Sequence, residues 1–514
     1  PKAAVPLYYA AEGYEQTGRF RKAKALYEEI VNNPKYRKQI RAIEEEECKT
    51  VGGKKRCRTV KKNQLDNVVN FLARAAWKAM EFKQAQKYYG DLAKGKIETD
   101  ESSIRVYSYY WYARLLRIYD EPRKAVTYYM KYYKDIQKVT ASLRKRLSAT
   151  SDTKEKASLQ SQLDEAKRFQ TEVFYQIGTI YKRLNDLRGM TKNYDKYISQ
   201  VAADLSSKPT STKDYYKNHP NVRAAAMKMM KVLHWLAVAN NERRRTRTAR
   251  SYEDKIINYF DKFNMPKGEN PAAEYAGEIA FRKVEADFQK FMKRKLTLNK
   301  IRLKTGFSKK PKKMIALMCE LMGWGKDKRG NKCKGKAIPM LSSVVNPYVT
   351  EIEKVTKGFM NDVGLKYLHP KWILAVRARM GQVYAKATND LENLPLPPEV
   401  VKFWKILWPF MQKYKVYPKL KQLFVNLMSQ YALDIDDEMI DMDMVLEAYK
   451  ERTYGIIRKN AAAMREEAVK NYIFGLQMAR SQGVSNEFTR AMRKGLSALK
   501  PDRYPYVNDA KVAD

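Results

Sequence analysis

The chain has 514 residues, with 101 Lys and Arg against 57 Asp and Glu, so its formal net charge is +44. Hydrophobic residues make up 44% and aromatic residues 12%, which excludes a disordered polycation because a large core can form. No run of 18 or more apolar residues occurs, which excludes an ordinary membrane-spanning helix. The charge surplus predicts a polyanionic partner: nucleic acid, lipopolysaccharide or anionic lipid headgroups, a wall polymer, or an acidic protein face.

The beginning of the chain gives no information on its compartment. The sequence starts at Pro1 without a methionine and shows no signal peptide. We expect a processed or partial chain, so the missing signal peptide does not indicate the cytoplasm.

The first clear pattern lies in residues 8–34, YYAAEGYEQTGRFRKAKALYEEIVNNP. Small residues alternate here with aromatic residues, at Ala11, Tyr14, Ala23 and Tyr27, with Gly18 at the expected turn and Pro34 at the end. The small residues let two helices approach closely, and the aromatic rings fill the space around them. This order is typical of a tetratricopeptide repeat (TPR), a pair of antiparallel helices.

The same intervals recur three times before residue 200. The predicted packing positions are Ala73, Ala76, Phe82, Ala85 and Tyr89, then Ala113, Leu116, Ala125 and Tyr129, and then Gly178, Tyr181, Leu187, Met190 and Tyr194. Four matches in register predict an all-α, TPR-like helical-repeat solenoid, a superhelix of stacked helix pairs. Generic amphipathic hairpins are the alternative, but they leave the shared intervals unexplained. We expect insertions at residues 35–65, as a hairpin that contains two cysteines, and at 140–170, as extended polar helices, and we expect no series of alternating β-strands.

Four cysteines form two local pairs. Cys48 and Cys57 bracket KTVGGKKR, and Cys319 and Cys333 bracket ELMGWGKDKRGNK, two loops in which glycines let the chain bend. We predict two disulfides, which indicate an oxidising compartment. The alternatives are a buried thiol at Cys319, which lies in an apolar run, and a zinc site, although no C-x-x-C is present.

Residues 201–345 show a looser helical pattern and contain two basic clusters. The first comprises Arg243, Arg244, Arg245, Arg247 and Arg250, and the second comprises Lys309, Lys310, Lys312 and Lys313. A solvated charged face is the alternative interpretation of either cluster. Because the whole chain has a large cation surplus, we predict that some of these residues bind an anion or an acidic partner, to which the planar fork of arginine is suited.

Residues 346–514 regain a regular helical pattern. WILAVRARMGQVYAKA has the character of a first TPR helix, with Gly381 and Tyr384 at packing positions. The loop LENLPLPPE interrupts this pattern, and MARSQGVSNEFTRAMRKGLSALKPDRYP closes the chain.

These motifs resemble the TPR proteins of the myxobacterial adventurous-gliding (focal adhesion) apparatus and their relatives in predatory bacteria. That family has a small-x-G-x-[VI]-Y helix, a loop with two prolines, G-[VI]-x-N-E-[WF]-T, and L-x-P-x-x-[YW]-P at the terminus. The matching positions within 370–510 are Gly381, Tyr384, Pro395, Pro397, Pro398, Gly483, Asn486, Glu487, Phe488, Thr489, Leu499, Pro501, Tyr504 and Pro505, with Phe488 where tryptophan is usual. The resemblance implies a periplasmic or outer-membrane-associated scaffold of a large envelope machine, and a flagellar-motor accessory is equally compatible.

No pattern of catalytic or metal-binding residues is present. His219, His234 and His369 lie far apart and lack metal-ligand spacing. GWGKDKRG lacks the G-K-[ST] of a phosphate-binding loop, and DIDDEMIDMDM at 434–444 has Met439 where a calcium loop needs glycine. No segment resembles the lysozyme-like domain of helical lytic transglycosylases, so we expect neither an enzyme nor a cofactor or metal.

The predicted organisation has three parts: N-terminal TPR-like repeats at 1–200, a looser helical middle at 201–345, and C-terminal TPR-like repeats at 346–514. We expect a non-catalytic, periplasmic scaffold that binds other subunits of a motility-related envelope machine and an anionic surface. The alternative is a nucleic-acid-binding helical-repeat protein, which predicts free thiols and steep salt dependence. Most of the 36 tyrosines fit packing positions rather than base stacking, which makes nucleic acid the less favoured partner.

Overall fold

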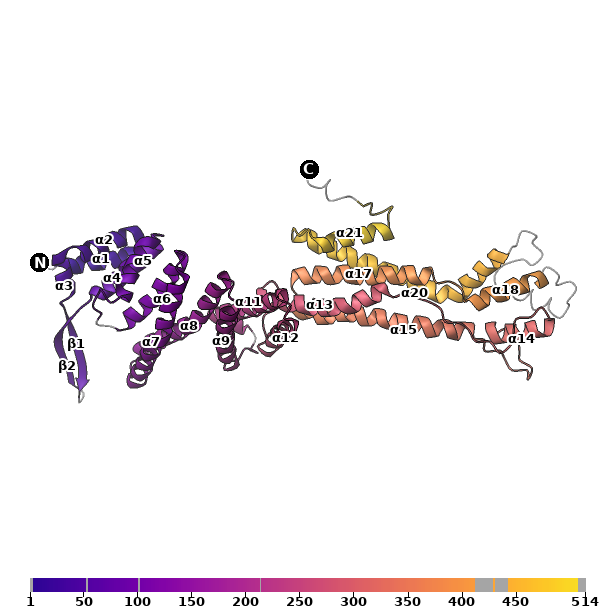
Figure 1. Ribbon diagram of the computed structural model, residues 1–514, viewed down its shortest axis with the longest axis horizontal. Helices are drawn as coiled ribbons and strands as arrows, with labels where there is room; N and C mark the ends of the chain where they lie inside the picture. Colours follow the sequence, from indigo (N-terminus) through magenta and orange to yellow (C-terminus); the bar gives the residue numbers. More distant parts are fainter. Residues whose placement is uncertain are drawn as a thin grey trace. The chain divides into compact units, whose positions relative to one another are not determined.

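The computed structural model describes residues 3–51, 54–99, 102–212, 214–411, 429 and 442–506 (Figure 1). The chain divides into two compact units, Pro1–Ala249 (unit 1) and Arg250–Asp514 (unit 2). The predicted all-α, TPR-like class is confirmed. The boundary between the units falls within the predicted middle region 201–345, because the helical pairs of unit 1 continue beyond residue 200.

Unit 1 is a series of helix pairs in which each helix packs on its neighbours in the sequence. The pairs are α1 (Ala4–Gln16) with α2 (Phe20–Asn32), α4 (Leu65–Lys78) with α5 (Phe82–Ala93), α6 (Ser102–Ile118) with α7 (Pro122–Ala149), and α8 (Thr153–Arg183) with α9 (Leu187–Ser206). The short helix α3 (Pro34–Ile40) follows the first pair, and α10 (Tyr215–Asn218) and α11 (Pro220–Glu242) follow the last. Because α11 packs on α9, the stacking continues past the fourth pair.

The helices of each pair are joined by the same three-residue turn, whose middle residue has a positive φ. These residues are Gly18 (φ 73°), Met80 (64°), Asp120 (61°) and Asn185 (54°). The turn recurs at the end of α11, where Arg244 has φ 57° and the N–H of Arg245 donates to the carbonyl of Asn240 at 2.8 Å. Helix α11 is therefore the first helix of a fifth repeat, in the region for which the sequence predicted only a loose pattern.

Small residues occupy equivalent positions around these turns. Seven residues before each positive-φ residue stand Ala11, Ala73, Ala113, Gly178 and Ala237, and all five are buried. A Cβ atom on Gly178 would lie 2.3 Å from the ring of Tyr194, so only glycine permits this approach of α8 and α9. The recurring small residues and turns, rather than overall composition, therefore determine how the helices stack.

One β-hairpin interrupts the helices of unit 1, within the insertion predicted as a cysteine hairpin at residues 35–65, and it adds two strands to a chain for which no alternating β-strand series was expected. Strand β1 (Ile43–Val51) pairs antiparallel with β2 (Lys54–Lys62), and the register places Cys48 opposite Cys57. In this register two of the four glutamates of β1 stand opposite a basic residue of β2, Glu44 opposite Lys61 and Glu47 opposite Arg58. The two strands carry too few apolar residues at alternate positions to be recognised as strands by a hydrophobic period of two.

Unit 2 is built around two long helices that pack on each other, α17 (Pro370–Glu392) and α20 (Met442–Ser481). Helices α13 (Pro271–Lys293) and α21 (Glu487–Leu499) also pack on α17. The remaining elements are α12 (Thr246–Lys262), α14 (Pro311–Met322), α15 (Ala337–Lys357), the π-helical turn η1 (Gly358–Gly364), α16 (Leu365–Tyr367) and α18 (Pro398–Met411). No helix within the described ranges is long and apolar enough to cross a membrane.

Several positions of the C-terminal motifs have structural roles in unit 2. Tyr472 of α20 is 1% exposed and lies against Gly381 of α17 and Gly495 of α21. Asn486 caps α21 by accepting from the N–H groups of Phe488 and Thr489, while the Thr489 hydroxyl accepts from the Asn486 N–H. The N-E-F-T motif is thus a capping box at the start of a helix.

Candidate binding surfaces

One candidate surface is the face of unit 1 on which the first helices of the repeats contact one another. We call it the first-helix face, and it is formed by the first helices of the five repeats, α1, α4, α6, α8 and α11. Arg74 of α4 forms an ion pair with Glu15 of α1, and Arg114 of α6 lies 5.0 Å from the ring centre of Trp77 of α4. An ion pair thus joins α1 to α4, and a cation–π contact joins α4 to α6.

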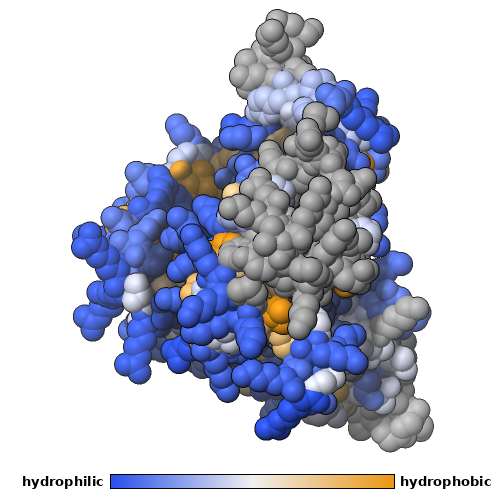
Figure 2. Space-filling model, turned by 90° about the vertical axis from the view of Figure 1, so that its right-hand side faces the viewer, coloured by the Kyte–Doolittle hydropathy of each residue, from blue (hydrophilic) through white to orange (hydrophobic). Residues whose placement is uncertain are grey.

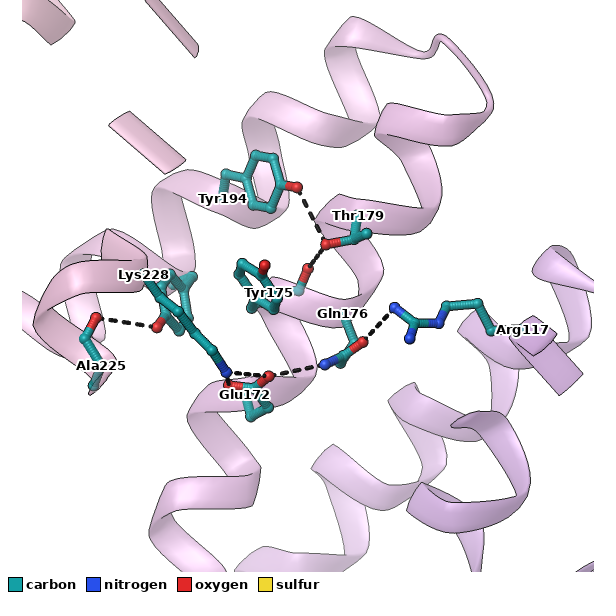
Figure 3. A network of polar contacts seen from close by, with 9 residues as sticks. Arg117, Glu172, Tyr175, Gln176, Thr179, Tyr194, Ala225 and Lys228 are labelled. Carbon is teal, nitrogen blue, oxygen red and sulfur yellow. Dashed lines mark hydrogen bonds and ion pairs between the residues drawn. The ribbon is translucent and has the colours of Figure 1, made fainter. Parts of the chain in front are cut away.

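The contacts of α8 with α6 and α11 form a continuous polar network (Figure 3). Arg117 of α6 donates to Gln176 Oε1 at 2.7 Å, and Gln176 donates to Glu172 at 2.8 Å. Lys228 of α11 reaches both Glu172 oxygens at 2.9 and 3.0 Å. This carboxylate is satisfied inside the unit, so the network stabilises the stacking and leaves Glu172 unavailable to a cationic partner.

Two lysines approach a single tryptophan on the same face. Lys182 Nζ of α8 lies 3.3 Å from the ring centre of Trp235 of α11, and Lys231 Nζ lies 5.0 Å from it. Burial and the charge of Lys231 lower the pKa of Lys182 below its ordinary value. Neither lysine has an acidic partner among the described residues. The pair presents two like charges beside an aromatic ring, an arrangement that an added carboxylate would stabilise.

Arginines extend this positive character along the face. Arg114 lies over the rings of both Trp77 and Trp111, and Arg117 contacts the neutral Gln176. Neither guanidinium has a carboxylate partner among the described residues. The first-helix face therefore carries four cations, Arg114, Arg117, Lys182 and Lys231, and all but Arg117 lie beside half-buried aromatic rings.

The first predicted basic cluster forms the turn after α11 and the start of α12. Arg243, Arg244, Arg245, Arg247 and Arg250 are all exposed, and the boundary between units falls just before Arg250. Arg243 donates to the carbonyl and side-chain oxygens of Asn185, at 3.2 and 3.0 Å, in the equivalent turn of the preceding pair. Arg243 thus joins two turns of the repeat series, whereas anion binding by the cluster stays a prediction.

The second predicted cluster belongs to a larger basic segment of unit 2. Lys309, Lys310, Lys312 and Lys313 precede or begin α14, and all four are exposed. Residues 293–336, which we call the basic lobe, contain 16 Lys and Arg but only two acids, Glu320 and Asp327. All of these cations except Arg294 and Lys336 are exposed. Figure 2 shows the end of unit 2 around α14 and α18, where hydrophilic residues predominate and hydrophobic residues form small separate groups.

Glu320 holds the separate pieces of the basic lobe together. Its carboxylate accepts from the backbone N–H groups of Lys304 and Thr305 at 2.6 and 2.7 Å, and from Lys336 Nζ at 2.7 Å. Burial alone would raise the pKa of Glu320, but these hydrogen bonds outweigh it and lower the pKa to about 2. The other acid, Asp327, accepts from the N–H groups of Arg329 and Asn331. Both acids are thus engaged in structure.

The low pKa of Glu320 predicts an acid-sensitive lobe. Because the folded pKa lies below the usual 4.5, the stabilisation is complete above about pH 4.5 and is lost as the pH falls towards 2. We expect Glu320→Gln to lower the free energy of unfolding by about 1–2 kcal/mol at pH 7, with the difference vanishing near pH 2. Urea unfolding of the unchanged protein and of the Glu320→Gln variant, between pH 7 and pH 2, measures this difference in the free energy of unfolding. Glu353→Gln is the control, because its exposed pair with Lys357 should contribute under about 0.5 kcal/mol.

A disulfide closes the loop of the basic lobe. Cys319 and Cys333 are bonded, with an S–S distance of 1.97 Å, so the predicted pairing is present. The hydrophobic cluster beneath includes Met318, Leu321 and Trp404. The second predicted pair stays a prediction, because the side chain of Cys48 lies outside the described residues.

The predicted packing positions and histidines lie as follows. The packing residues Ala11, Ala23, Tyr27, Ala76, Ala85, Tyr89, Ala125, Tyr129, Gly178, Tyr194 and Gly381 are buried, Tyr14, Tyr181 and Tyr384 are half-buried, and Gly18 is exposed in its turn. His219 stacks on Tyr215 with ring centres 4.2 Å apart, and no cluster of three metal-ligating side chains occurs among the described residues. Residues 434–441 of the acidic run lie outside that part of the chain.

The first-helix cations were missed by the sequence analysis because they are distant in sequence. Lys182 and Trp235 belong to different repeats, and only the stacking of α8 on its neighbours makes them adjacent. A signal was nevertheless present, because Arg117 and Lys182 both stand three residues before the positive-φ residue of their turns. The disulfide loop also carries exposed cations, Lys326, Lys328 and Arg329 among them, which the sequence pattern did not assign to either basic cluster.

No protein-family model and no curated protein matches the chain. Among solved structures, it is similar to a putative kinesin light chain of Podosopora anserina with nearly identical TPR-like repeats, at 14% identity, over 50% of this chain and 97% of that chain, with a TM-score of 0.27. It is similar to the TPR domain of P58(IPK) at 10% identity, over 85% and 97% of the chains, with a TM-score of 0.17. Similarities with TM-scores this low do not establish a fold. The fold is therefore assigned from the recurring turns and small residues of unit 1.

Proposed function

We propose that this chain is a non-catalytic scaffold of a bacterial cell-envelope machine, and that its first-helix face binds an acidic segment of a partner protein. The observation that carries the proposal is the pair of Lys182 and Lys231 beside Trp235, two cations without an acidic partner among the described residues. A carboxylate between them would form charge-assisted hydrogen bonds and relieve their mutual repulsion. Stacked helical repeats offer such a face to an extended or helical segment.

An oxidising, periplasmic location is part of the proposal. The disulfide of Cys319 with Cys333 supports it, because such bonds persist mainly outside reducing compartments. The resemblance of residues 370–510 to gliding-machinery proteins supports assigning the scaffold to a motility-related assembly. Anionic envelope polymers or lipid headgroups are the proposed partners of the remaining positive charge.

A peptide-binding experiment tests the first-helix face. Fluorescence anisotropy of the full chain with a labelled glutamate-rich peptide should show binding, and the glutamine version of the peptide should bind at least tenfold more weakly. Lys182→Gln/Lys231→Gln should weaken binding of the acidic peptide by about three- to tenfold, since each exposed ion pair contributes under about 1 kcal/mol.

The matched control lies on a second helix of unit 1. Lys83→Gln/Lys87→Gln on α5 removes the same charge, and Lys87 likewise lies beside an aromatic ring, Tyr88. Equal losses in the two double variants would contradict the assignment to the first-helix face. Tighter binding of single-stranded RNA than of the peptide would favour the nucleic-acid alternative instead.

The location is tested separately. Mass spectrometry of protein taken from its native source without reductant should find Cys319 and Cys333 joined. Alkylation of all four cysteines in that sample would contradict an envelope location.

A further inference from the structure

We propose that the basic lobe of unit 2 binds the surface of a membrane containing anionic phospholipids. This inference deepens the anionic-partner part of the proposed function, and none of its residues belongs to the first-helix face. It rests on the density of unpaired charge in the lobe, on the kind of cation, and on exposed aliphatic residues among the cations.

The charge of the lobe is available to a ligand. Of the 16 cations of the lobe, all of which lie in the described part of the chain, only Arg294 and Lys336 form ion pairs, with Glu351 and Glu320 respectively. Both acids of the lobe are already engaged by hydrogen bonds. Lys309, Lys310, Lys312 and Lys313 adjoin the N-terminus of α14, whose helix dipole adds further positive potential. The repulsion among these groups is relieved only by an external anion or by salt.

The lobe is held together as one body, which lets its charges act on one partner. Glu320 binds the backbone at Lys304 and Thr305 to α14, and Lys336 Nζ also donates to the carbonyl of Arg302 at 2.7 Å. The disulfide holds the other end, where the N–H of Cys333 donates to the carbonyl of Gly325 at 3.0 Å. The extended segment, α14 and the disulfide loop are thus cross-linked to each other.

The kind of cation favours a lipid surface over nucleic acid. Thirteen of the 16 cations are lysines, which interact with phosphate as point charges, whereas readers of bases rely on the arginine fork. The lobe also offers no exposed ring for base stacking. Trp324 packs against Trp404 and Tyr449 with ring centres 5.8 and 6.0 Å apart, and Lys402 covers Phe307 at 4.6 Å.

Exposed aliphatic residues adjoin the cations. Ile315 in the first turns of α14 is 38% exposed, and Ile338 in the first turn of α15 is 59% exposed. Lys312 and Ile315 are three residues apart on α14 and therefore share its outward side. A peripheral membrane-binding surface combines these two kinds of residue. Its cations contact the headgroups, and its aliphatic side chains enter the boundary of the acyl chains.

Vesicle co-sedimentation of the full chain tests the proposal. The protein should sediment with phosphatidylcholine vesicles that contain phosphatidylglycerol, not with phosphatidylcholine alone, and added salt should release it. Replacing Lys309, Lys310, Lys312 and Lys313 by Gln should weaken vesicle binding at least tenfold. Ile315→Ser/Ile338→Ser should weaken it about three- to tenfold without changing the charge.

The matched control removes four exposed cations elsewhere in unit 2, with Arg480, Arg490, Lys494 and Arg503 all changed to Gln. It should retain vesicle binding within about twofold, and circular dichroism should show every variant folded. Equal loss in the control, or equal binding to both vesicle types, would overturn the proposal. It is also overturned if duplex DNA binds more tightly than vesicles and the isoleucine variant binds vesicles normally. The lysine variant should still bind the acidic peptide, so failure here is distinct from failure of the proposed function.

Discussion

Replacing Tyr472 with alanine is expected to lower the free energy of unfolding of unit 2 by about 3–5 kcal/mol, the usual cost of deleting a buried aromatic side chain. The ring is 1% exposed and fills the space where α17, α20 and α21 meet. The two glycines beside the ring have no side chains that could move into the cavity. Hydrogen exchange of α17 and α20, combined with urea unfolding of the full chain, measures the loss.

A double-mutant cycle separates packing from a general effect of the substitution. A Cβ on Gly381 would lie 2.2 Å from the Tyr472 ring, so Gly381→Ala alone should cost about 1–3 kcal/mol. In the Tyr472→Ala background the same change should be neutral or stabilising, because the added methyl meets empty space and alanine favours a helix. Additive effects in the cycle would contradict the direct contact. Gly455→Ala, where a Cβ meets nothing within 4 Å, is the control for helix propensity.

Removing the disulfide of the basic lobe is expected to have the second largest effect. Cys319 and Cys333 are 14 residues apart. A bond that closes a loop of this length lowers the entropy of the unfolded chain and so stabilises the folded state by about 3 kcal/mol. Cys319→Ser/Cys333→Ser should therefore lower the stability of the hydrophobic cluster under α14 by about 2–4 kcal/mol. Hydrogen exchange of α14 and the first turn of α15 reports this loss.

The single variants are the control for this prediction. Each removes the whole bond, so Cys319→Ser and Cys333→Ser should each cost nearly as much as the double variant. Independent, additive costs would indicate two buried thiols. In the serine variants, vesicle binding should weaken less than in the lysine variant, because the charges remain and only their arrangement loosens.

The helical pairs of unit 1 were predictable because their signals are local. Two helices joined by three residues must meet, so Ala11 and Ala23, or Gly178 and Tyr194, can be matched within one short stretch of sequence. The fifth first helix was missed for an equally local reason. Nine residues after its positive-φ residue this pair has Glu253, where the four earlier pairs have tyrosine. The hairpin lies in the insertion predicted at residues 35–65, but its β-strands were not predicted because they carry few apolar residues at alternate positions.

Some features of the candidate surfaces were predictable from the sequence, and others were not. The clusters at Arg243 and Lys309 are runs in the sequence and could be read from it, as could the pairing of Cys319 with Cys333. The first-helix face could not be read, because Lys182 and Trp235 belong to different helices and meet only through stacking. The role of Glu320 was also hidden, since its partners at Lys304 and Thr305 are backbone groups of an irregular segment.

The sequence by itself determined the helical class, the repeat spacing and the surplus of positive charge, because composition and local periodicity suffice for each. Only the tertiary structure decided which of those charges are already paired. It neutralises Arg74 with Glu15 and Lys228 with Glu172, and leaves Lys182, Lys231 and most of the basic lobe without acidic partners among the described residues. The physical reason is that pairing requires atoms within a few ångströms, and helix stacking sets those distances between residues far apart in the chain.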